Sequence, residues 1–367
     1  MRTEPPHVAI VDGASFVLPY DHGLASGLAR RGWRVTLFAS ETRYNAEFLD
    51  ALPSTVEVRR FAVSRTAAPR ARGVWNYLRL WREVWRRRAE FDAVNLQFGI
   101  LWPLERWFLR RLPFVFTLHN AVPHGFAGAR HGPTEEALRL ARRVVFLSRA
   151  SRDDAERRYG PLPHAAVLPH GLLPVVAGEP PVPYAEAPPP EALVVWGNVA
   201  PYKGVELLLD LARDPAWRTR GLPLEVHGRF EPGLEGLRAD LQAAGVTVVD
   251  RFLSPAELHA LTARPVVFLL PHRRATQSGA LYTLLHRGCR VLCSDSGDLG
   301  DFMRRHGLGG LLLADRTPAA VLAALDRLRA EPERWTAAFA AAQRSADWDA
   351  GLADAEAAYG LLRKSGR

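Results

Sequence analysis

The sequence predicts an α/β protein with two doubly wound, Rossmann-like domains, and three observations lead to this fold class. The chain of 367 residues is longer than the ~100–200 residues of a typical single domain. Short apolar runs rich in Val, Leu and Phe alternate with helical patterns, which is typical of a parallel sheet covered on both faces. A proline-dense stretch without periodicity, residues 172–192, divides the alternation into two parts.

The apolar runs predict strands in both parts of the chain. In the first part they are His7–Val11, Arg34–Ala39, Thr55–Phe61, Phe91–Phe98, Pro113–His119, Arg143–Ser148 and Ala165–Pro169. Helical patterns fall between them at Gly23–Arg31, Gly73–Glu90 and Pro133–Arg142. In the second part the strands are Ala192–Trp196, Pro223–Gly228, Val246–Val249, Pro265–Leu270, Cys289–Ser294 and Gly310–Leu313. Two such domains are expected to present facing crevices at the carboxyl ends of their strands, where open α/β sheets bind ligands.

The proline-dense stretch sets the expected domain boundaries. We expect an N-terminal domain over residues 1–172, a linker over 173–190 and a C-terminal domain over 191–345. Cys289 and Cys293 have no His or Cys companions, which indicates buried thiols in a reducing compartment. No apolar signal-peptide core opens the chain, and no run approaches the ~18–20 apolar residues of a spanning helix. We therefore expect a cytoplasmic protein.

The charge of the chain favours anionic partners. Its net charge is +9 and its pI is near 10.1, values that suit phosphorylated ligands, a membrane surface or nucleic acid. A general preference for Arg would explain much of this excess without any partner. No zinc-finger or RNA-recognition signature is present, so nucleic acid is not an expected partner.

One lysine stands in an unusual place. The chain has 48 Lys plus Arg residues, yet Lys occurs only at 203 and 364. Lys203 lies between Gly197, which follows a predicted strand, and Gly204, which is expected to open a helix. Backbone amides at a helix N-terminus and an adjacent ammonium group both favour a phosphate. The alternative is a solvated loop lysine.

A second turn has the same character. A strand ends at Pro271, the loop carries Arg273 and Arg274, and Gln277-Ser278-Gly279 is expected to open a helix. Ser278 is a candidate N-cap or phosphate ligand, and Gly279 would allow close backbone approach. Two such turns on one sheet edge suit a diphosphate. No G-x-G-x-x-G follows the first strand in either half, which argues against a nicotinamide or flavin dehydrogenase, and no Walker A lysine motif is present.

The order of these motifs resembles one family. Gly-x5-Lys-Gly, a His-Gly pair near residue 227, "FLSPAEL", a proline-ended strand, a Ser-Gly turn and a Gly-x-x-Val-x-x-Ser-Asp strand resemble group 1 glycosyltransferases of GT-B architecture. "HGLASGLARRGWRVTLF", "TLHN", "FLSRAS" and "VLPHGL" fit the first half of that family. Residues 346–367 resemble its terminal helix, which crosses back to the N-terminal domain. The resemblance covers nearly the whole chain.

The sequence departs from the family pattern at three positions. The family usually has two donor-site glutamates eight residues apart, where this chain has Ala275 and Thr283, and an arginine where it has Asn198. "LHNAVPHG" and "LLPHRRATQSGALY" are similar to a subset of bacterial sugar transferases that includes exopolysaccharide β-mannosyltransferases. Whether the enzyme retains or inverts the anomeric configuration is left open.

The resemblance implies transfer of a hexose, of mannose or glucose type, from a GDP- or UDP-linked sugar to a saccharide acceptor, with no cofactor. Lys203, Ser278 and Gly279 would hold the diphosphate, and charge on it in the transition state would be stabilised there. Further donor-side positions implied by the resemblance are Gly197, Asn198, Arg229, Phe252, Leu253, Arg273, Arg274, Gln277 and Thr283. No Asp-x-Asp motif stands at a strand end, so no divalent metal is expected.

Two residues of the first half are candidate catalytic groups. His119 matches the family histidine near the transferring sugar, with a turn or N-cap role as the alternative. Asp21, expected in the loop after the first strand, would be the base of an inverting enzyme. A helix N-cap is the alternative role for Asp21.

A Trp- and Arg-rich region suggests where an acceptor would be met. Trp75, Leu78, Trp81, Val84 and Trp85 form a helical stripe, and a similar mixture recurs in "LWPLERWFLRRLPF". Arginines occupy much of the remaining helix, at positions 79, 82, 86, 87 and 88. A core-facing stripe with a solvated basic face is the alternative. We expect residues 74–111 to dock on anionic membrane, on the inner face of the plasma membrane, and to receive a lipid-linked acceptor.

Two other functions suit the same residues. One is a sugar-nucleotide epimerase or hydrolase of the same fold, which would need neither acceptor nor membrane. The other is a non-catalytic nucleotide-sugar-binding protein, to which the missing glutamates and the high pI give weight.

Overall fold

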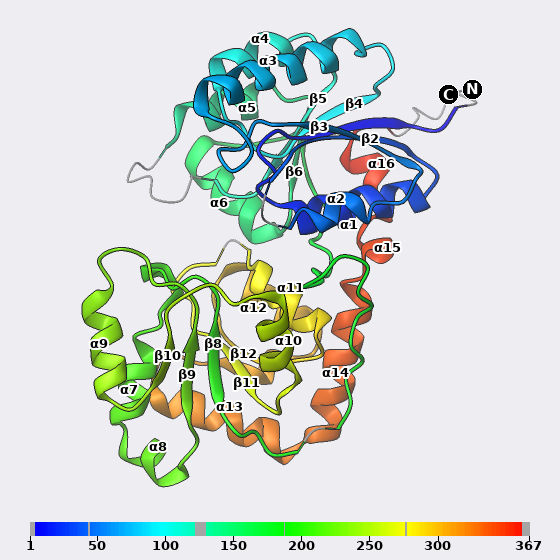
Figure 1. The fold of residues 1–367 in the computed structure, drawn as a ribbon. Helices are drawn as coiled ribbons and strands as arrows, with labels where there is room; N and C mark the ends of the chain where they lie inside the picture. The colour runs from blue at the N-terminus through cyan, green and yellow to red at the C-terminus, as the bar shows by residue number, and fades with distance from the viewer. Residues whose placement is uncertain (1–3, 43–44, 122–129, 187, 276, 362–367) are drawn as a thin grey trace. The chain divides into compact units, whose positions relative to one another are not determined.

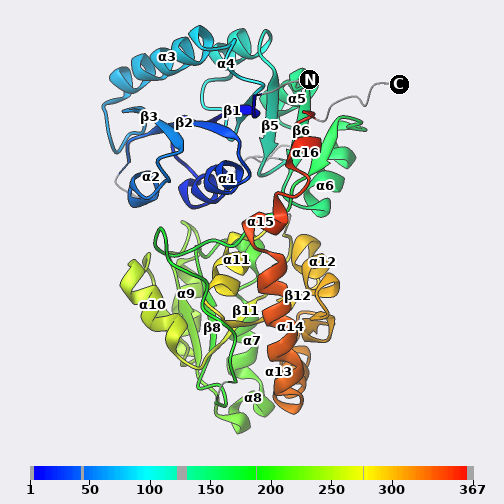
Figure 2. The same cartoon turned by 90° about the vertical axis from the view of Figure 1, so that its right-hand side faces the viewer.

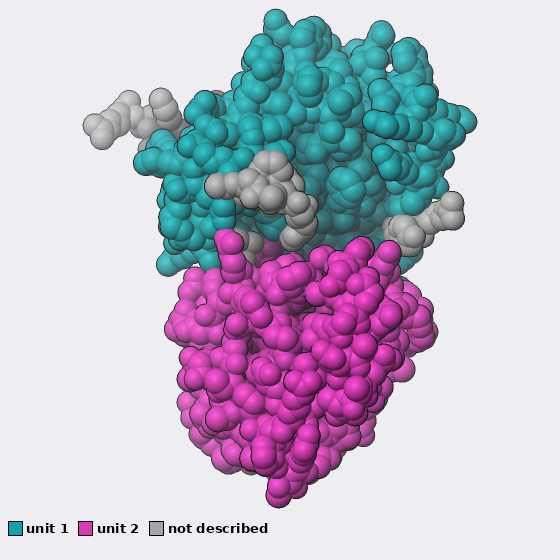
Figure 3. All heavy atoms as spheres, turned by 90° about the vertical axis from the view of Figure 1, so that its left-hand side faces the viewer, with its two compact units in different colours: residues 1–171, 176–178, 347–367 teal, residues 172–175, 179–346 magenta. Residues whose placement is uncertain are grey.

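The computed structural model describes residues 4–42, 45–121, 130–186, 188–275 and 277–361. The chain divides into two compact units, which Figure 3 colours separately. Unit 1 comprises Met1–Gly171, Val176–Gly178 and Asp347–Arg367, and unit 2 comprises Leu172–Val175 and Glu179–Ala346. Each unit is a parallel sheet between helices, and both sheets are doubly wound.

Unit 1 contains a seven-stranded sheet in the order β3-β2-β1-β4-β5-β6-β7. Its strands are β1 (His7–Asp12), β2 (Arg34–Ser40), β3 (Val56–Phe61), β4 (Ala93–Leu96), β5 (Phe114–Leu118), β6 (Arg143–Phe146) and β7 (Ala165–Val167). All six residues of β1 are buried, as a central strand of a parallel sheet requires. The strand order reverses between β1 and β4, which marks the point where ligands bind in such sheets.

The helices of unit 1 cover both faces of this sheet. They are α1 (Leu18–Arg30), α2 (Glu47–Asp50), α3 (Arg70–Arg86), α4 (Trp102–Leu109), α5 (Gly132–Leu140) and α6 (Arg149–Tyr159). In Figure 1, α3 and α4 lie on one side of the strands, and α1 and α2 lie on the other. Trp81 of α3 and Phe108 of α4 are both buried and stack with their ring centroids 5.9 Å apart.

Unit 2 contains a six-stranded sheet in the order β10-β9-β8-β11-β12-β13. Its strands are β8 (Leu193–Trp196), β9 (Leu224–His227), β10 (Thr247–Val249), β11 (Val267–Leu270), β12 (Arg290–Ser294) and β13 (Leu312–Leu313). The helices are α7 (Leu207–Arg213), α8 (Pro215–Arg220), α9 (Glu235–Ala243), α10 (Pro255–Ala263), α11 (Gly279–His286), α12 (Gly297–Arg305), α13 (Pro318–Ala330) and α14 (Pro332–Ser345), with short 3₁₀ turns at Pro201–Lys203 and Gly309–Leu311. The order reverses between β8 and β11.

Local sequence signals explain where several helices begin. The side chains of Ser148, Asp214 and Thr317 accept hydrogen bonds from backbone amides at the starts of α6, α8 and α13. Ser254 and Glu257 form a complete capping box on α10. The predicted fold class and every predicted strand are confirmed, with boundaries that differ by at most a few residues.

The proline-dense segment is built into unit 2 from Glu179 onward. The Tyr184 hydroxyl donates to the Cys289 carbonyl oxygen at 2.8 Å, and its ring stacks on Phe339 with centroids 5.2 Å apart. The Glu179 carboxylate forms an ion pair with Arg287. These residues therefore form part of the surface of unit 2, and little of the segment serves only as a spacer. Cys289 and Cys293 are buried free thiols, as predicted.

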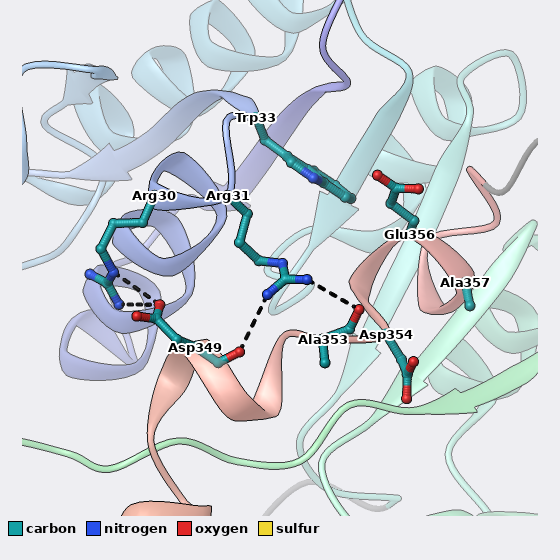
Figure 4. A pocket seen from close by; sticks show the side chains of 8 residues that line it. All are labelled: Arg30, Arg31, Trp33, Asp349, Ala353, Asp354, Glu356 and Ala357. Atoms are coloured by element: carbon teal, nitrogen blue, oxygen red, sulfur yellow. Dashed lines mark hydrogen bonds and ion pairs between the residues drawn. The ribbon is translucent and has the colours of Figure 1, made fainter.

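Residues after Asp347 pack on unit 1 as two short helices, α15 (Trp348–Gly351) and α16 (Ala355–Ala358), rather than one terminal helix. The Arg30 guanidinium forms an ion pair with Asp349 at 2.9 Å. Arg31 donates to the carbonyl oxygens of Asp349 and Ala353, both at 3.4 Å (Figure 4). Figure 2 shows α15 and α16 continuing the chain from α14. Among the described helices, none is both long enough and apolar enough to span a membrane.

Candidate functional site

The loop after β8 is shaped by Gly204. Residues Pro201–Lys203 form a 3₁₀ turn, and Gly204 ends it with a left-handed φ of 67°. Helix α7 begins at Leu207, so the expectation that Gly204 opens this helix is wrong. A Cβ atom at position 204 would lie 2.1 Å from the carbonyl oxygen of Pro271. Only glycine permits both the backbone conformation and this approach.

The contact at Gly204 joins the loops that follow β8 and β11, on either side of the strand-order reversal. A second contact between these loops is a hydrogen bond from the Arg273 amide to the Tyr202 carbonyl oxygen at 2.8 Å. As a result, Lys203 lies near enough to His272 for its charge to affect that ring. The loops after β8 and β11, both of which the sequence singled out, therefore lie against each other in unit 2.

Lys203 is mostly buried and has no ion-pair partner among the described residues. Burial lowers the pKa of its ammonium group to about 8, and the more distant Glu231 carboxylate opposes that shift. A buried cation without an adjacent carboxylate is costly, and an anionic ligand would relieve that cost. The position of this charge suits a phosphate.

His272, which the sequence analysis did not select, also belongs to this site. Its side chain is buried, and its Nδ1 atom has no hydrogen-bond partner among the described residues. Burial, and then the charge on Lys203, lowers the pKa of His272 to about 3, so the ring is neutral. The Ser294 hydroxyl donates to the His272 carbonyl oxygen at 2.7 Å and fixes the backbone. Its place directly after the strand-ending proline was a signal that could have identified it.

The two arginines of the second loop differ in their surroundings. Arg273 donates to the Glu206 carboxylate from Nε and Nη2 at 2.8 and 2.5 Å, and Arg316 reaches the same carboxylate at 3.2 Å. The charge of Arg273 is therefore largely compensated. Arg274 is exposed and forms no ion pair within the described part of the chain, so it is the more available cation.

Ser278 and Gly279 occupy the predicted helix start. Ser278 is the N-cap residue of α11, but its buried hydroxyl makes no capping hydrogen bond. A Cβ atom at Gly279 would lie 3.5 Å from Leu173, an ordinary contact, so protein packing alone does not require glycine there. Gln277 has a buried Oε1 atom without a partner among the described residues. Thr283 is buried within α11. Phosphate contact by Ser278 and Gly279 stays a prediction.

The remaining donor-side residues gather at the ends of β8, β9 and β10, which are neighbours in the sheet. Gly228 directly follows β9 and lies against Gly197. A Cβ atom at position 228 would be 1.9 Å from the Gly197 carbonyl oxygen. Asn198 donates to the Glu231 carboxylate at 2.9 Å. Arg229 lies over the ring of Phe252, which is 63% exposed, and Leu253 packs partly into the core. An exposed aromatic ring beside a guanidinium suits a nucleobase.

In unit 1, His119 lies directly after β5 and is buried. Its ring stacks on Phe98 with centroids 4.6 Å apart and meets Tyr20 edge-on at 5.1 Å. Nε2 is 2.9 Å from the Gln97 side-chain oxygen, which assigns the proton to Nε2. Burial, and then His170, lowers the pKa of His119 to about 3. No helix begins at His119, so the alternative N-cap role is wrong, while its role near the sugar stays a prediction.

Asp21 does not lie in a loop, because α1 begins earlier, at Leu18. Its side chain is fully buried beside Asp12, the last residue of β1. Burial raises the pKa of Asp21 well above its usual range, and the Asp12 carboxylate raises it further. Asp12 accepts a hydrogen bond from the Val17 amide at 3.1 Å, and Val17 is the N-cap. The loop position and the N-cap alternative are therefore both wrong, while the catalytic role of Asp21 stays a prediction.

The Trp- and Arg-rich segment is divided between core and surface. Trp81 and Val84 are fully buried, whereas Trp75 and Trp107 are 58% and 53% exposed. The ring centroids of Trp85 and Trp107 are 5.9 Å apart, and the Arg88 guanidinium lies 4.6 Å from the centroid of the Trp85 ring. The core-facing alternative thus holds for the centre of the stripe. The ends of the stripe leave indole rings among arginines at the surface.

Unit 1 also has a pocket of about 570 Å³ at the carboxyl ends of β4 and β5. Its wall includes Gln97, Phe98, Glu105 and His119, together with Leu96, Gly99, Ile100, Leu101, Trp102, Pro103, Phe116, Thr117, Leu118, Asn120, His131, Pro133, Thr134 and Ala137. Separately, no three His, Cys, Asp or Glu side chains of the described residues are grouped as a metal site would require. Independence from metal stays a prediction.

Comparison with known proteins agrees with this arrangement. Residues 22–172 match the model of Glycosyltransferase Family 4. A D-inositol 3-phosphate glycosyltransferase of Frankia alni is 32% identical over 47% of this chain and 44% of its own length, so that match spans less than half of the relative. A GDP-mannose:glycolipid 4-β-D-mannosyltransferase of Xanthomonas campestris pv. campestris is 27% identical over 80% of this chain and 82% of its own.

Solved structures show the same fold. The sucrose-phosphate synthase of Thermosynechococcus elongatus superposes with a TM-score of 0.68 at 18% identity, covering 98% of this chain and 99% of that one. At this identity the likeness shows the fold alone. The chain therefore has the two-domain GT-B fold, and its residues 22–172, less than half of its length, match the glycosyltransferase family 4 model.

Proposed function

We propose that the protein is a glycosyltransferase that transfers a hexose from a nucleotide-diphosphate sugar to a lipid-linked saccharide, in polysaccharide or glycoconjugate synthesis. The observation that carries the donor assignment is the mostly buried Lys203 ammonium, which has no carboxylate partner in the described chain. It lies near His272 in the loop after β11, and that loop leads to α11, whose first backbone amides would favour a phosphate. The name of the Xanthomonas relative, a transferase from GDP-mannose to a glycolipid, supports a donor and an acceptor of these classes.

The chemistry proposed for unit 2 is stabilisation of the leaving diphosphate. As the bond between the sugar and the phosphate breaks, negative charge builds up on the phosphate oxygens. Lys203 and the amides at Gly279 would hold that charge in a site where water is largely excluded. Arg274 would add charge from the exposed side, since Arg273 is engaged with Glu206. No metal or cofactor is part of this proposal.

The acceptor is proposed to reach unit 1 on an anionic membrane, on the cytoplasmic side. The exposed face of α3 carries Trp75, Arg79, Arg82 and Arg86, which are spaced by three or four residues and so lie on one side of the helix. Indole rings prefer the lipid–water interface, and arginines are attracted to anionic head groups. Trp107 on α4 adds a second exposed indole.

Product analysis tests the proposal against its alternatives. The protein is incubated with radiolabelled GDP-mannose or UDP-glucose, with and without a bacterial lipid extract. Label that moves into the lipid phase only when the extract is present supports the transferase. Free sugar in both reactions would indicate a hydrolase, and a changed nucleotide sugar would indicate an epimerase. Unchanged substrate, despite nucleotide binding, would indicate a non-catalytic binding protein.

A further inference from the structure

Unit 2 has a pocket of about 740 Å³ at the amino edge of its sheet, the edge opposite the loops that carry Lys203 and His272. It forms where the proline-dense segment passes the starts of β11 and β12 and the junction of α13 and α14. A concave site of this volume is within the range of small-molecule sites. We call it the amino-edge pocket, and its wall includes Arg264, Arg287, Arg290 and Arg329.

The apolar part of this wall includes prolines from three segments, residues 188–190, Pro265 and Pro332. None of these prolines is fully buried, so their rings are open to a ligand. The fixed φ of proline limits the movement of this wall, and ordering it on binding therefore costs little. The Gln343 side chain also holds the proline-dense segment, because it donates to the Val182 carbonyl oxygen at 2.8 Å. The pocket thus has a preformed apolar side.

Two of the four arginines are already paired with carboxylates. Arg264 donates from Nη1 and Nη2 to the two oxygens of Glu225 at 2.9 and 2.8 Å. Its Nε atom donates to Glu191 at 2.6 Å. Arg287 forms an ion pair with Glu179. The charges of these two side chains are compensated, and their main effect is to hold the wall together.

Arg290 differs from these two because it forms no ion pair among the described residues. Its Nη2 atom donates to the Ala185 carbonyl oxygen at 3.0 Å and to the Thr336 hydroxyl at 3.1 Å, which fixes the orientation of the guanidinium. Its Nε and Nη1 atoms make no hydrogen bond within the described part of the chain, and neither is sealed from solvent. Burial lowers the pKa of Arg290, and the Tyr184 hydroxyl and the Glu186 carboxylate oppose that shift. Two oriented donors of a half-buried cation are therefore open to an anion.

Arg329 supplies a second cation to the same wall. It is exposed near the end of α13 and has neither an ion pair nor a hydrogen bond among the residues that the structure describes. It also lines an adjoining hollow of about 310 Å³, which shares Pro189 and Pro190 with the amino-edge pocket. Glu186 is the acidic residue of the wall, and it is exposed and forms no ion pair within the described ranges. The uncompensated charge of the wall is therefore positive.

We propose that the amino-edge pocket binds a phosphate ester of an apolar alcohol, with the phosphate on Arg290 and Arg329 and the apolar body against Pro265 and residues 188–190. Inorganic phosphate would leave the proline wall in water, and a neutral hydrocarbon would leave Arg290 without an anion. An alkyl phosphate satisfies both sides of the pocket. The inference goes beyond the proposed function, because this site does not include the loops after β8 and β11. Unit 2 would then bind two phosphorylated compounds at once, one at each edge of its sheet.

The test is calorimetric titration of the full chain with octyl phosphate below its micellar concentration, with inorganic phosphate and with 1-octanol. We expect octyl phosphate to bind most tightly, inorganic phosphate at least about tenfold more weakly, and 1-octanol without saturation. If 1-octanol bound as tightly as octyl phosphate, the arginines would have no part in binding and the inference would be overturned. If inorganic phosphate bound as tightly, the apolar wall would have no part, and the inference would fail as well.

Two variants locate the binding. Arg290→Gln removes the charge and keeps a side-chain amide that can still donate to the Ala185 carbonyl oxygen. We expect the Kd for octyl phosphate to rise at least about tenfold, the effect of losing a hydrogen bond between charged groups. Arg329→Gln should raise the Kd about twofold to fivefold, because an exposed charge contributes less. Arg329 makes no contact that supports the fold, so this variant tests the site even if Arg290→Gln does not fold.

Arg213→Gln is the matched control, since Arg213 is an exposed arginine of unit 2 outside the pocket wall. It should leave the Kd for octyl phosphate unchanged. Folded Arg290→Gln and Arg329→Gln proteins that both bind octyl phosphate like the parent would overturn the inference. A titration in the presence of excess GDP separates this site from the proposed donor site. We expect the Kd for octyl phosphate to stay the same, whereas displacement by GDP would assign octyl phosphate to the opposite edge and contradict the amino-edge site.

Discussion

The carboxyl edges of the two sheets have the same topology and opposite chemistry. In unit 2 the loops after β8 and β11 meet at the strand-order reversal and hold Lys203, beside the neutral ring of His272. In unit 1 the residues at the ends of β1 and β4 include the buried acid Asp12 and the uncharged Gln97. The doubly wound fold fixes where a ligand can bind, and the loop residues decide its charge. A cationic edge suits the diphosphate of the proposed donor.

Gly279→Val should have the largest effect on the cationic edge. The added Cβ has room against Leu173, so the fold should persist, but a branched side chain would block a phosphate from the amides of α11. We expect calorimetry to detect no binding of GDP or UDP. Gly236→Val is the control, because it lies in the first turn of α9 with open space around it. Normal nucleotide binding by Gly279→Val would show that the phosphate binds elsewhere.

Lys203→Ala should have the second-largest effect on the cationic edge. Removing a single electrostatic donor typically costs ~2–4 kcal/mol of transition-state stabilisation, which is measured as kcat/KM for the nucleotide sugar. Arg273→Ala is the comparison, and its effect should be smaller because Glu206 already compensates that charge. Near-parent turnover by a folded Lys203→Ala protein would remove the main difference between the two edges.

Arg79, Arg82 and Arg86 test the surface of unit 1. Replacing all three with Gln should weaken binding to anionic vesicles by up to ~3 kcal/mol, from about 1 kcal/mol for each basic residue. Binding is measured by co-sedimentation at low and high salt. Arg87 is left intact because its ion pairs with Glu57 and Glu90 support the fold.

The control triple replaces the exposed arginines 213, 218 and 344 of unit 2, and it should leave vesicle binding unchanged. Equal binding of the parent protein to neutral and anionic vesicles would refute the docking surface. A soluble acceptor would then be the better proposal.

The pH dependence of donor binding should sharpen the assignment of Lys203. Its pKa of about 8 means that the ammonium is charged at pH 7 and loses its proton as the pH rises through 8. Nucleoside diphosphate affinity should therefore fall toward pH 9, by up to about tenfold per pH unit where a single proton is linked. Lys203→Arg keeps its charge over this range and should flatten the profile. A parent profile that is flat between pH 7 and 9 would contradict the role of Lys203.

Asp21→Asn should give the smallest effect and tests the acidic pair of unit 1. The pKa of Asp21 is raised in the folded state, so the folded protein holds a proton that the unfolded chain releases above its ordinary pKa. Stability is therefore highest below that ordinary pKa and falls as the pH rises toward the folded-state pKa. The neutral Asn side chain should reduce this fall, as measured by the unfolding midpoint in urea between pH 5 and 9. A large loss of kcat at unchanged stability would instead restore Asp21 as a catalytic group.

The sequence predicted the strands well because both sheets are buried on two faces. Their strands, such as His7–Asp12 and Arg290–Ser294, therefore appear as apolar runs bounded by turn residues. The start of α7 was predicted wrongly, because Gly204 serves loop packing against Pro271 and does not open the helix. The start of α1 was also missed, which placed Asp21 in a loop.

Site residues could be predicted only where a glycine beside them marks the end of a strand or the start of a helix. Lys203 and Ser278 stand beside glycines at strand ends, and that position identified them. Arg290 lies inside a predicted strand, and Arg329 lies on a helix with a second arginine. Their significance depends on which of their hydrogen-bonding atoms are already engaged, and that follows from tertiary contacts which spacing along the chain does not encode.

The discontinuity of unit 1 has a consequence for synthesis on the ribosome. Residues from Asp347 onward complete unit 1. About 175 residues, most of them in unit 2, separate them from Gly171 and are synthesised first. At typical translation rates this is a delay of roughly 9–35 s. Until then the surface that Trp348 and Tyr359 cover is open, including Asn95, which later donates to the Tyr359 hydroxyl. The unit whose synthesis begins first is thus finished after unit 2, and a nascent chain stalled before Trp348 would present that surface to chaperones.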